Sequence, residues 1–183
     1  MIAPSLPDPL PWSAPRVTLR RLRAGDLSAF QAYRHDAEVG RYQGWEPTPD
    51  AEALAFLTEM AQAPFGRPGE WLQIAIADGT DDRLLGDVGL HLMAAGREAE
   101  FGITLARSAQ GRGLAEEAAR VLIDGLREHT AVRRLIAITD VRNIASARLL
   151  RRLGMTLEAE ASAEFRGEPC REWNFALALD LDG

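Results

Sequence analysis

Residues 99–115 read AEFGITLARSAQGRGLA and decide the fold of this chain. The first seven predict a strand, and an amphipathic helix is predicted to begin at the end of the stretch. Between them, Gly111 and Gly113 permit a tight turn with exposed backbone amides. Such amides, together with the positive end of a helix dipole, attract anions. We therefore predict that residues 110–115 bind a phosphate group, with Arg112 adding a charged hydrogen bond.

Two common phosphate motifs do not match this turn. No Gly-Lys-Ser/Thr follows, as a P-loop requires, and Glu116 stands where the dinucleotide fingerprint has its third glycine. Because Glu116 and Glu117 add negative charge to the first helical turn, a pyrophosphate diester fits better than a nucleotide γ-phosphate. A plain strand-to-helix connection and a dinucleotide site remain the alternatives for this segment.

Apolar periodicity predicts the elements that precede the turn. A turn at 78–79 separates two strand-like runs and predicts a hairpin, which the next strand extends into an antiparallel meander. A helix at 50–63 is predicted to bury a stripe of Leu54, Leu57 and Ala61. The predicted upstream elements are a strand at 17–22, a helix opening at 25–26, the helix at 50–63, and strands at 71–77 and 84–93.

The elements after the turn form a βαβ unit followed by a terminal pair of strands. The helix from Leu114 covers the sheet with one apolar face and leads to 134–139, an apolar, β-branched run typical of a central strand. A shorter helix at 144–153 ends at Gly154 as its C-cap. The last two strands are predicted at 155–165 and 172–181.

The bulk composition predicts a globular protein. Its 183 residues are 46% hydrophobic and 26% charged, which suits a single domain at 16–183 after a proline-rich arm at 1–15. A net charge of −6 argues against binding to nucleic acid or to an anionic membrane surface. Cys170 is the only cysteine, so no thiolate cluster exists and we expect no metal. No apolar run approaches the roughly 20 residues of a membrane span, and the N-terminus lacks a signal-peptide pattern, so we expect a cytoplasmic protein.

Several motifs carry a resemblance to a known family. Gln110, Gly113 and Ala115 fit the pattern Gln/Arg-x-x-Gly-x-Gly/Ala, and the further motifs are Glu100-Phe101-Gly102, Asn143-x-x-Ser146 and Leu153-Gly154-Met155. With these motifs the sequence resembles the GNAT superfamily of N-acetyltransferases, most closely the branch of ribosomal-protein N-terminal (Rim-type) acetyltransferases. The resemblance extends from about Val17 to Leu181.

This resemblance implies both a fold and a cosubstrate. The fold is α+β (mixed α/β) in three layers, a twisted and mostly antiparallel mixed sheet of about seven strands with helices on both faces. The fourth and fifth strands splay apart, and acetyl-CoA lies in the cleft with its pantetheine arm along residues 102–105. The residues implied in cofactor binding are Ile103, Leu105, Gln110, Gly111, Arg112, Gly113, Leu114, Ala115 and Asn143.

The resemblance also implies catalytic residues. Glu100 takes the ammonium proton of the acceptor directly or through water, although a simple outward-facing strand carboxylate is the alternative. Many GNAT enzymes have a tyrosine as general acid seven residues after the asparagine, where this chain has Leu150. Ser146 is then the best remaining donor to the leaving thiolate, with water as its alternative. A backbone amide near Ile103 or Thr104 meets the oxyanion, and Asn143 is a helix cap whether or not it contacts the cofactor.

The acceptor side is implied to be the loop that carries Tyr42 and Trp45, since aromatic rings beside carboxylates suit a protonated amine. Trp45 as a packing residue is the alternative. The favoured acceptor is a peptide or protein N-terminal amine, ahead of a polyamine or aminoglycoside, and a non-catalytic acyl-CoA-binding module is the other class. The arginines near the end of the 144–153 helix are explained by the helix dipole, although one of them contacting the 3′-phosphate stays open. The chain is expected to be a monomer or a homodimer.

Overall fold

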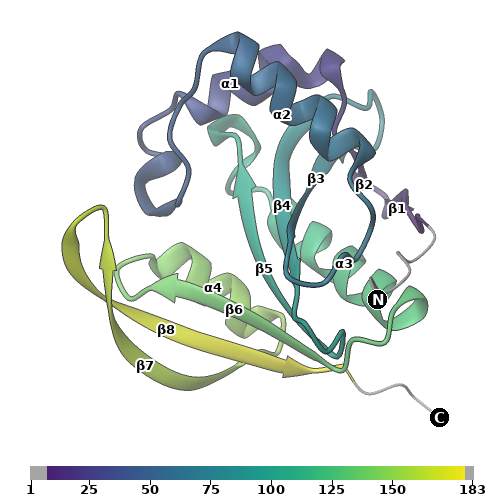
Figure 1. Cartoon of the computed structure of the whole chain (residues 1–183). Coiled ribbons are helices and arrows are strands. Elements are labelled where there is room, and N and C mark those ends of the chain that lie inside the picture. Colours follow the sequence, from purple (N-terminus) through teal and green to yellow (C-terminus); the bar gives the residue numbers. More distant parts are fainter. Residues whose placement is uncertain (1–7, 180–183) are drawn as a thin grey trace.

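The computed structural model describes residues 8–179 and contains a central sheet with helices on both sides (Figure 1). The predicted proline arm at 1–15 therefore lies partly outside the described residues, as does the predicted end of the last strand at Leu181. The strands are β1 (Trp12–Ser13), β2 (Val17–Arg21), β3 (Trp71–Asp78), β4 (Leu84–Leu92), β5 (Glu98–Leu105), β6 (Arg134–Asp140), β7 (Thr156–Phe165) and β8 (Glu168–Ala178). The helices are α1 (Leu27–Arg34), α2 (Asp50–Gln62), α3 (Leu114–His129) and α4 (Ile144–Arg152), with short 3-10 helices η1 (Ala24–Asp26), η2 (Gly40–Tyr42) and η3 (Arg107–Ala109).

The sheet has the order β1-β2-β3-β4-β5-β6-β8-β7, and β5 with β6 is its parallel pair among antiparallel neighbours. Helices α1 and α2 pack on one face, against β4 and β3. Helix α3 packs on the other face against β1, β2 and β5, and α4 lies beside α3 and β6. The predicted three-layer, mostly antiparallel mixed sheet is confirmed, with eight strands in the described part because β1 adds a short edge strand.

Strands β5 and β6 separate soon after they begin, as predicted. Their pairing is limited to Glu98–Glu100 against Arg134–Ile136, whereas β4 pairs with β5 along seven positions from Gly86 to Leu92. Beyond Glu100, the edge of β5 that faces β6 is therefore left without a paired strand. β5 and β6 correspond to the fourth and fifth strands of the expected sheet, because the additional short strand β1 shifts the strand numbering by one.

The short strand β1 holds the described part of the arm against the back of α3. Trp12 is buried, its ring centroid lies 5.6 Å from that of Phe65, and it stacks on His129 at 5.8 Å. Gly125 of α3 permits this approach, because a Cβ at that position would lie only 2.3 Å from the indole ring. The arm is thus anchored by a tryptophan that fits only over a glycine.

Two predictions about element faces and bounds are wrong in detail. Helix α2 buries Ala53, Leu57 and Met60, while Leu54 is 38% exposed, because the face that meets the sheet is rotated from the predicted stripe. Strand β8 begins at Glu168, since a two-residue turn connects it directly to β7 and extends pairing to Phe165. The longer hairpin carries the end of β7 to the far side of the cleft.

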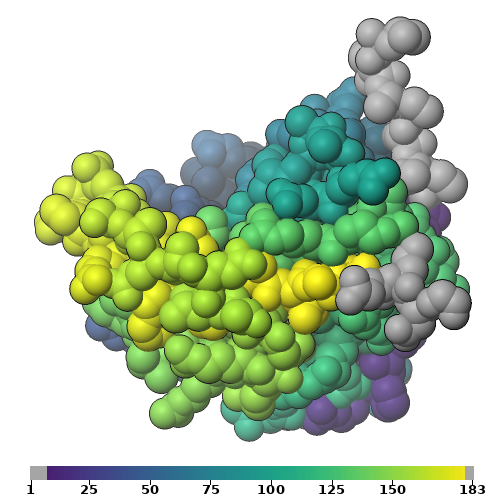
Figure 2. Space-filling model, turned by 90° about the horizontal axis from the view of Figure 1, so that it is seen from below, coloured from purple at the N-terminus to yellow at the C-terminus, as the bar shows by residue number. Residues whose placement is uncertain are grey.

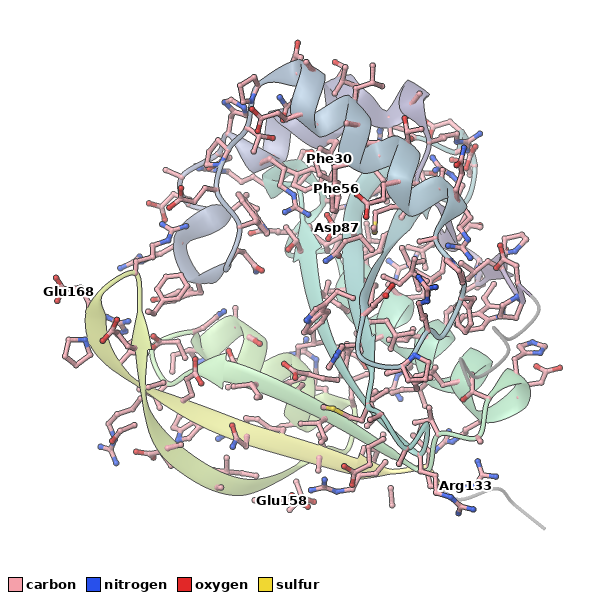
Figure 3. All side chains as sticks on the ribbon, viewed as in Figure 1. Phe30, Phe56, Asp87, Arg133, Glu158 and Glu168 are labelled. Carbon is pink, nitrogen blue, oxygen red and sulfur yellow. The ribbon has the colours of Figure 1, made fainter. Side chains whose placement is uncertain are left out.

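A buried ionic network joins α1 to the centre of the sheet. Asp87 of β4 accepts hydrogen bonds from the Tyr33 hydroxyl at 2.5 Å and from Arg34 Nη2 at 2.9 Å. Burial, followed by the nearby Asp87 charge, raises the pKa of Tyr33 well above its ordinary value, so the phenol stays a donor. Figure 3 labels Asp87 beneath Phe30 and Phe56, between the sheet and the two helices. The network fixes α1 and the loop that follows it.

Candidate active site

The splay between β5 and β6 opens into a cavity of about 750 Å³. Its walls are the 101–105 end of β5, the glycine turn with the first residues of α3, and one side of α4. The predicted site residues that line it are Tyr42, Ile103, Leu105, Gln110, Gly111, Gly113, Leu114, Ala115, Asn143 and Ser146. Three predicted site residues, Glu100, Arg112 and Trp45, do not line it.

The glycine turn presents unpaired amides at the start of α3. Gly111 and Gly113 have φ values of 72° and 76°, in the left-handed region that favours glycine. Among residues 8–179, no protein acceptor bonds the amides of 111–116, and the first paired amide is that of Glu117, which donates to the Gly113 carbonyl at 3.1 Å. Six successive amides at a helix N-terminus thus remain available to an anion.

Arg16, a residue that sequence reasoning missed, supports the turn from behind. Its Nη1 donates to the Arg112 carbonyl at 2.9 Å, and its backbone amide donates to Glu117 Oε1 at 2.8 Å. At the other end of the turn, Gln110 Nε2 donates to the Leu105 carbonyl at 2.9 Å. Arg16 and Gln110 therefore occupy carbonyl groups and leave the amides free. No local signal marks Arg16, because it lies 96 residues before Arg112.

Arginines offset the acidic residues that follow the turn. Glu116 accepts from Arg152 Nε at 2.7 Å and from Arg120 Nη2 at 2.9 Å, and these contacts, Arg152 first, hold its pKa below the ordinary value. Glu117 is bonded to Arg16. The two carboxylates that disfavour a phosphate at this helix are thus each paired with a cation. Arg152, one of the arginines near the end of the 144–153 helix, lines the cavity but is paired with Glu116.

Helix α4 places Asn143 and Ser146 on the opposite wall. Asn143 is the N-cap, and its side-chain oxygen accepts from the Ser146 amide at 3.2 Å. In the described part of the chain the Ser146 hydroxyl has no hydrogen-bond partner, and it lines the cavity. Leu150 is buried and also lines the cavity, so this position supplies no proton donor. Ser146 is therefore a free hydroxyl on the cleft wall.

A second, smaller cavity of about 140 Å³ continues from the first. It shares Tyr42, Gly102 and Ser146 with the large cavity, and its remaining wall includes Glu172 and Phe165 from the terminal hairpin. The Tyr42 hydroxyl donates to the Arg142 carbonyl at 3.5 Å across the cleft. The small cavity is thus the region where the N-terminal loop and the terminal hairpin meet.

Glu100 lies on β5 beside the small cavity without lining it. It is partly buried, pairs with His91 across β4 and β5, and lies near Glu172. Burial raises the pKa of Glu100, His91 opposes this shift, and the Glu172 charge adds to it. Glu98, on the same strand face, instead pairs with Arg134 at 3.3 Å. The two strand glutamates therefore differ, and Glu100 is the one whose carboxyl can be protonated above the ordinary range.

Trp45 contacts the buried network and not the cavities. The Arg34 guanidinium lies 4.4 Å from its ring centroid, and its ring limits the space at Gly40, where a Cβ would come within 3.2 Å. The ring is therefore a packing element that shapes the loop bearing Tyr42. Within the described residues, no group of three or more His, Cys, Asp or Glu side chains has a metal-binding arrangement. No helix of that part is long and apolar enough to cross a membrane.

The cleft fits a coenzyme A thioester as a bound cosubstrate. A Cβ at Gly111 would meet no atom within 4 Å, the adjacent amides lack protein acceptors, and the cavity of about 750 Å³ has the size of a large ligand site. The turn would hold the pyrophosphate, and the free edge of β5 would hold the pantetheine. When bound, the thioester supplies the acyl group for transfer. Fold and site together define the class of an acyl-CoA-dependent transferase.

Comparison with known proteins assigns the family. Residues 16–156 match the family model of the acetyltransferase (GNAT) domain. The spermidine N(1)-acetyltransferase of Escherichia coli K12 is 30% identical over 153 residues, 84% of this chain and 80% of that protein. The crystal structure of a GNAT-family acetyltransferase from Bacillus anthracis has a TM-score of 0.81 at 19% identity, over 93% of this chain and 99% of that one. The RimL ribosomal L7/L12 alpha-N-protein acetyltransferase in complex with coenzyme A has the same TM-score and identity, over 94% and 100%.

This chain therefore belongs to the GNAT acetyltransferase family. The predicted class of enzyme, an acetyl-CoA-dependent N-acetyltransferase, is confirmed.

Proposed function

We propose that this enzyme acetylates the N-terminal amine of a peptide or protein by direct attack of the amine on acetyl-CoA. The observation that carries the transfer is the series of unpaired amides at 111–116, which opens onto a cavity that continues to a smaller one beside Glu100. The large cavity is assigned to the cosubstrate and the small one to the amine. The cosubstrate residues are those of the turn, the edge of β5 and Asn143.

The charges of the two cavities support an acceptor with one cationic amine. Of the acidic residues that line them, Glu38, Glu116 and Asp140 each pair with an arginine. Glu172 has no ion pair within residues 8–179. One lining carboxylate without an ion pair matches the single ammonium of a peptide N-terminus, and a second carboxylate nearby that has no ion pair in the described residues, Glu100, is the proposed acceptor of its proton.

The side chains divide the proton transfers between two sides of the cleft. Glu100, whose pKa is raised by burial, accepts the ammonium proton directly or through water. The Ser146 hydroxyl donates a proton toward the leaving sulfur, and a backbone amide of β5 near Ile103 or Thr104 stabilises the oxyanion. Tyr42 lines both cavities and orients the acceptor amine.

A polyamine is the second candidate acceptor. It is favoured by the 30% identity to the Escherichia coli enzyme whose name gives spermidine as its substrate. A polyamine carries several ammonium groups, and the cavities do not offer a carboxylate to each of them. Its remaining ammonium groups would have to pair with exposed acidic side chains of the hairpin. The two acceptors therefore differ in the number of carboxylates that binding requires.

A thiol-release assay with acetyl-CoA tests the proposal against peptides with a free or blocked N-terminus, spermidine and an aminoglycoside. We expect release with the free peptide and none with the blocked one. Glu172→Gln should raise the acceptor KM roughly fivefold, which corresponds to about 1 kcal/mol for a partly exposed ion pair. Glu164→Gln, an exposed acid of the same hairpin outside both cavities, is the control. Release with spermidine alone would replace the peptide with the polyamine, and none with any amine would refute catalysis.

A further inference from the structure

The tip of the β7–β8 hairpin binds the 40–45 loop across the cleft. Arg166 Nη2 donates to the carbonyl oxygens of Gly40, Gln43 and Trp45, each at 3.3 Å. We call this set of contacts the Arg166 clasp. In Figure 1 the yellow hairpin tip rises toward the blue loop that precedes α2. Figure 2 shows from below that the same hairpin projects at the edge of the molecule, beside blue atoms of the N-terminal part.

The hairpin turn itself does not explain an arginine at this position. Arg166 and Gly167 form a two-residue turn with φ values of 54° and 78°, so both are left-handed. Such turns favour asparagine followed by glycine, because a side chain with a full Cβ is strained at positive φ. A strained backbone conformation of this kind persists where contacts with the surrounding structure hold it, often at functional sites. Here the left-handed backbone directs the guanidinium at three carbonyl groups of another segment.

The clasp bridges the cleft on the side where β5 and β6 are no longer paired. β5 and β6 are paired only at Glu98–Glu100 against Arg134–Ile136, so the cleft widens away from that end. On the acceptor side, the Arg166 clasp and the 3.5 Å contact between Tyr42 and the Arg142 carbonyl join the N-terminal loop to the C-terminal part. These contacts oppose the widening of the cleft.

The clasp also connects two walls of the small cavity. Tyr42 and Gln43 of the loop line that cavity, and so does Phe165 of the hairpin. The Arg166 guanidinium lies 5.0 Å from the Phe165 ring centroid while it holds the Gln43 carbonyl. Its contacts therefore fix the separation between Phe165 and the 40–45 loop.

We propose that Arg166 is a positioning residue that sets the width of the small cavity and thereby selects acceptors with little bulk beside the reacting amine. This inference rests on the proposed function of that cavity. Its volume of about 140 Å³ is close to that of a cavity that holds benzene, so it accepts a group of about six heavy atoms. A short chain end fits while the clasp is closed, and a bulky side chain next to the amine does not.

The test compares two acceptor peptides that differ only in their first residue, alanine or tryptophan, using wild-type protein and Arg166→Asn. Asparagine suits the left-handed turn, so the hairpin is retained while the guanidinium is lost. We expect the ratio of kcat/KM for the tryptophan peptide to that for the alanine peptide to rise about tenfold, a size of effect typical of pocket contacts. The KM for acetyl-CoA should change less than the peptide ratio, because the clasp does not touch the glycine turn and reaches the large cavity only through the loop that carries Tyr42 and Gln43.

Matched variants separate the clasp from charge and stability. Arg171→Asn removes an arginine of the same hairpin that pairs with Glu160 and does not contact the 40–45 loop, so its ratio should equal that of wild type. Arg166→Lys keeps the charge without the planar fork and should give an intermediate ratio. Amide hydrogen exchange of residues 40–46 should be faster in Arg166→Asn than in Arg171→Asn.

The outcomes are distinct. An unchanged peptide ratio in Arg166→Asn, or exchange of the loop equal to that of wild type, overturns the proposal. A drop in activity that is equal for both peptides assigns Arg166 a purely structural role and also overturns it. Absence of thiol release with every amine refutes the proposed function instead. The selectivity assigned to Arg166 is then refuted too, even if amide hydrogen exchange shows that Arg166 holds the 40–45 loop.

Discussion

Replacing Gly113 by alanine tests the anion site most directly. Gly113 has a φ of 76°, and a new Cβ would meet only the Arg16 guanidinium, at 3.6 Å. The side chain is therefore accommodated, but the left-handed backbone costs about 1–2 kcal/mol for a residue other than glycine. Relief of that strain rotates the backbone and redirects the amides at the start of α3. The substitution is therefore expected to change the direction of the amides without disturbing the packing around Gly113.

The expected magnitude follows from the unpaired amides. A hydrogen bond to a charged group is worth about 1.5–3 kcal/mol, so the loss of one such bond weakens coenzyme A binding about 10- to 100-fold. Isothermal titration calorimetry with coenzyme A measures the change in Kd. Chemical denaturation measures the free energy of unfolding, which should fall by about 1–2 kcal/mol.

Gly154→Ala is the matched control. Gly154 follows α4 with a φ of 83°, a Cβ added there would meet no atom within 4 Å, and the residue does not line the cavity. Both variants should therefore lose similar stability, while Gly113→Ala alone loses coenzyme A affinity. Equal Kd values in the two variants would show that the turn at 110–115 does not hold the cosubstrate.

Two further predictions concern the proton transfers. Because burial raises the pKa of Glu100, kcat with saturating acceptor should rise with pH through a pKa above the ordinary glutamate value of 4.5. Glu100→Gln should remove this rise of kcat with pH, and Glu98→Gln should keep it. If the same rise persists in Glu100→Gln, Glu100 is not the base. Ser146→Ala should lower kcat about 10- to 100-fold with little change in coenzyme A affinity, as measured by steady-state kinetics and calorimetry, whereas an unchanged kcat would assign the proton to water.

Much of the fold was predictable because its signals are local. The bounds of β3, β4, β5 and β6 follow from periodicity within each segment, and the parallel β5–β6 pair follows from the helix between them. The stripe of α2 was not predictable in the same way. Its buried residues are Ala53, Leu57 and Met60, and which side of a moderately apolar helix meets the sheet is decided by the sheet.

The residues of the candidate site likewise fall into those that local sequence predicts and those that depend on tertiary contacts. The residues of the glycine turn and the pair Asn143 and Ser146 are close in sequence, so their spacing alone indicated an anion turn and a capped helix. The sequence left Trp45 open between an acceptor contact and a packing role, and it did not indicate that Arg112 lies outside the cavities, because the direction of a side chain depends on its tertiary surroundings. In the structure the Arg34 guanidinium stacks on the Trp45 ring at 4.4 Å, and this ring lines neither cavity.

By itself the sequence determined most of the elements, the glycine turn and the family motifs, since each of these depends on neighbours within a few residues of one another. Only the tertiary structure decided that Arg16 supports the turn, that Arg152 offsets Glu116, and that Glu172 lies beside Glu100. Those contacts join residues from distant segments, and the order and splay of the strands bring them together. A charged or hydrogen-bonding partner that is remote in sequence produces no local sequence pattern, so the electrostatics of this cleft follow only from the tertiary structure.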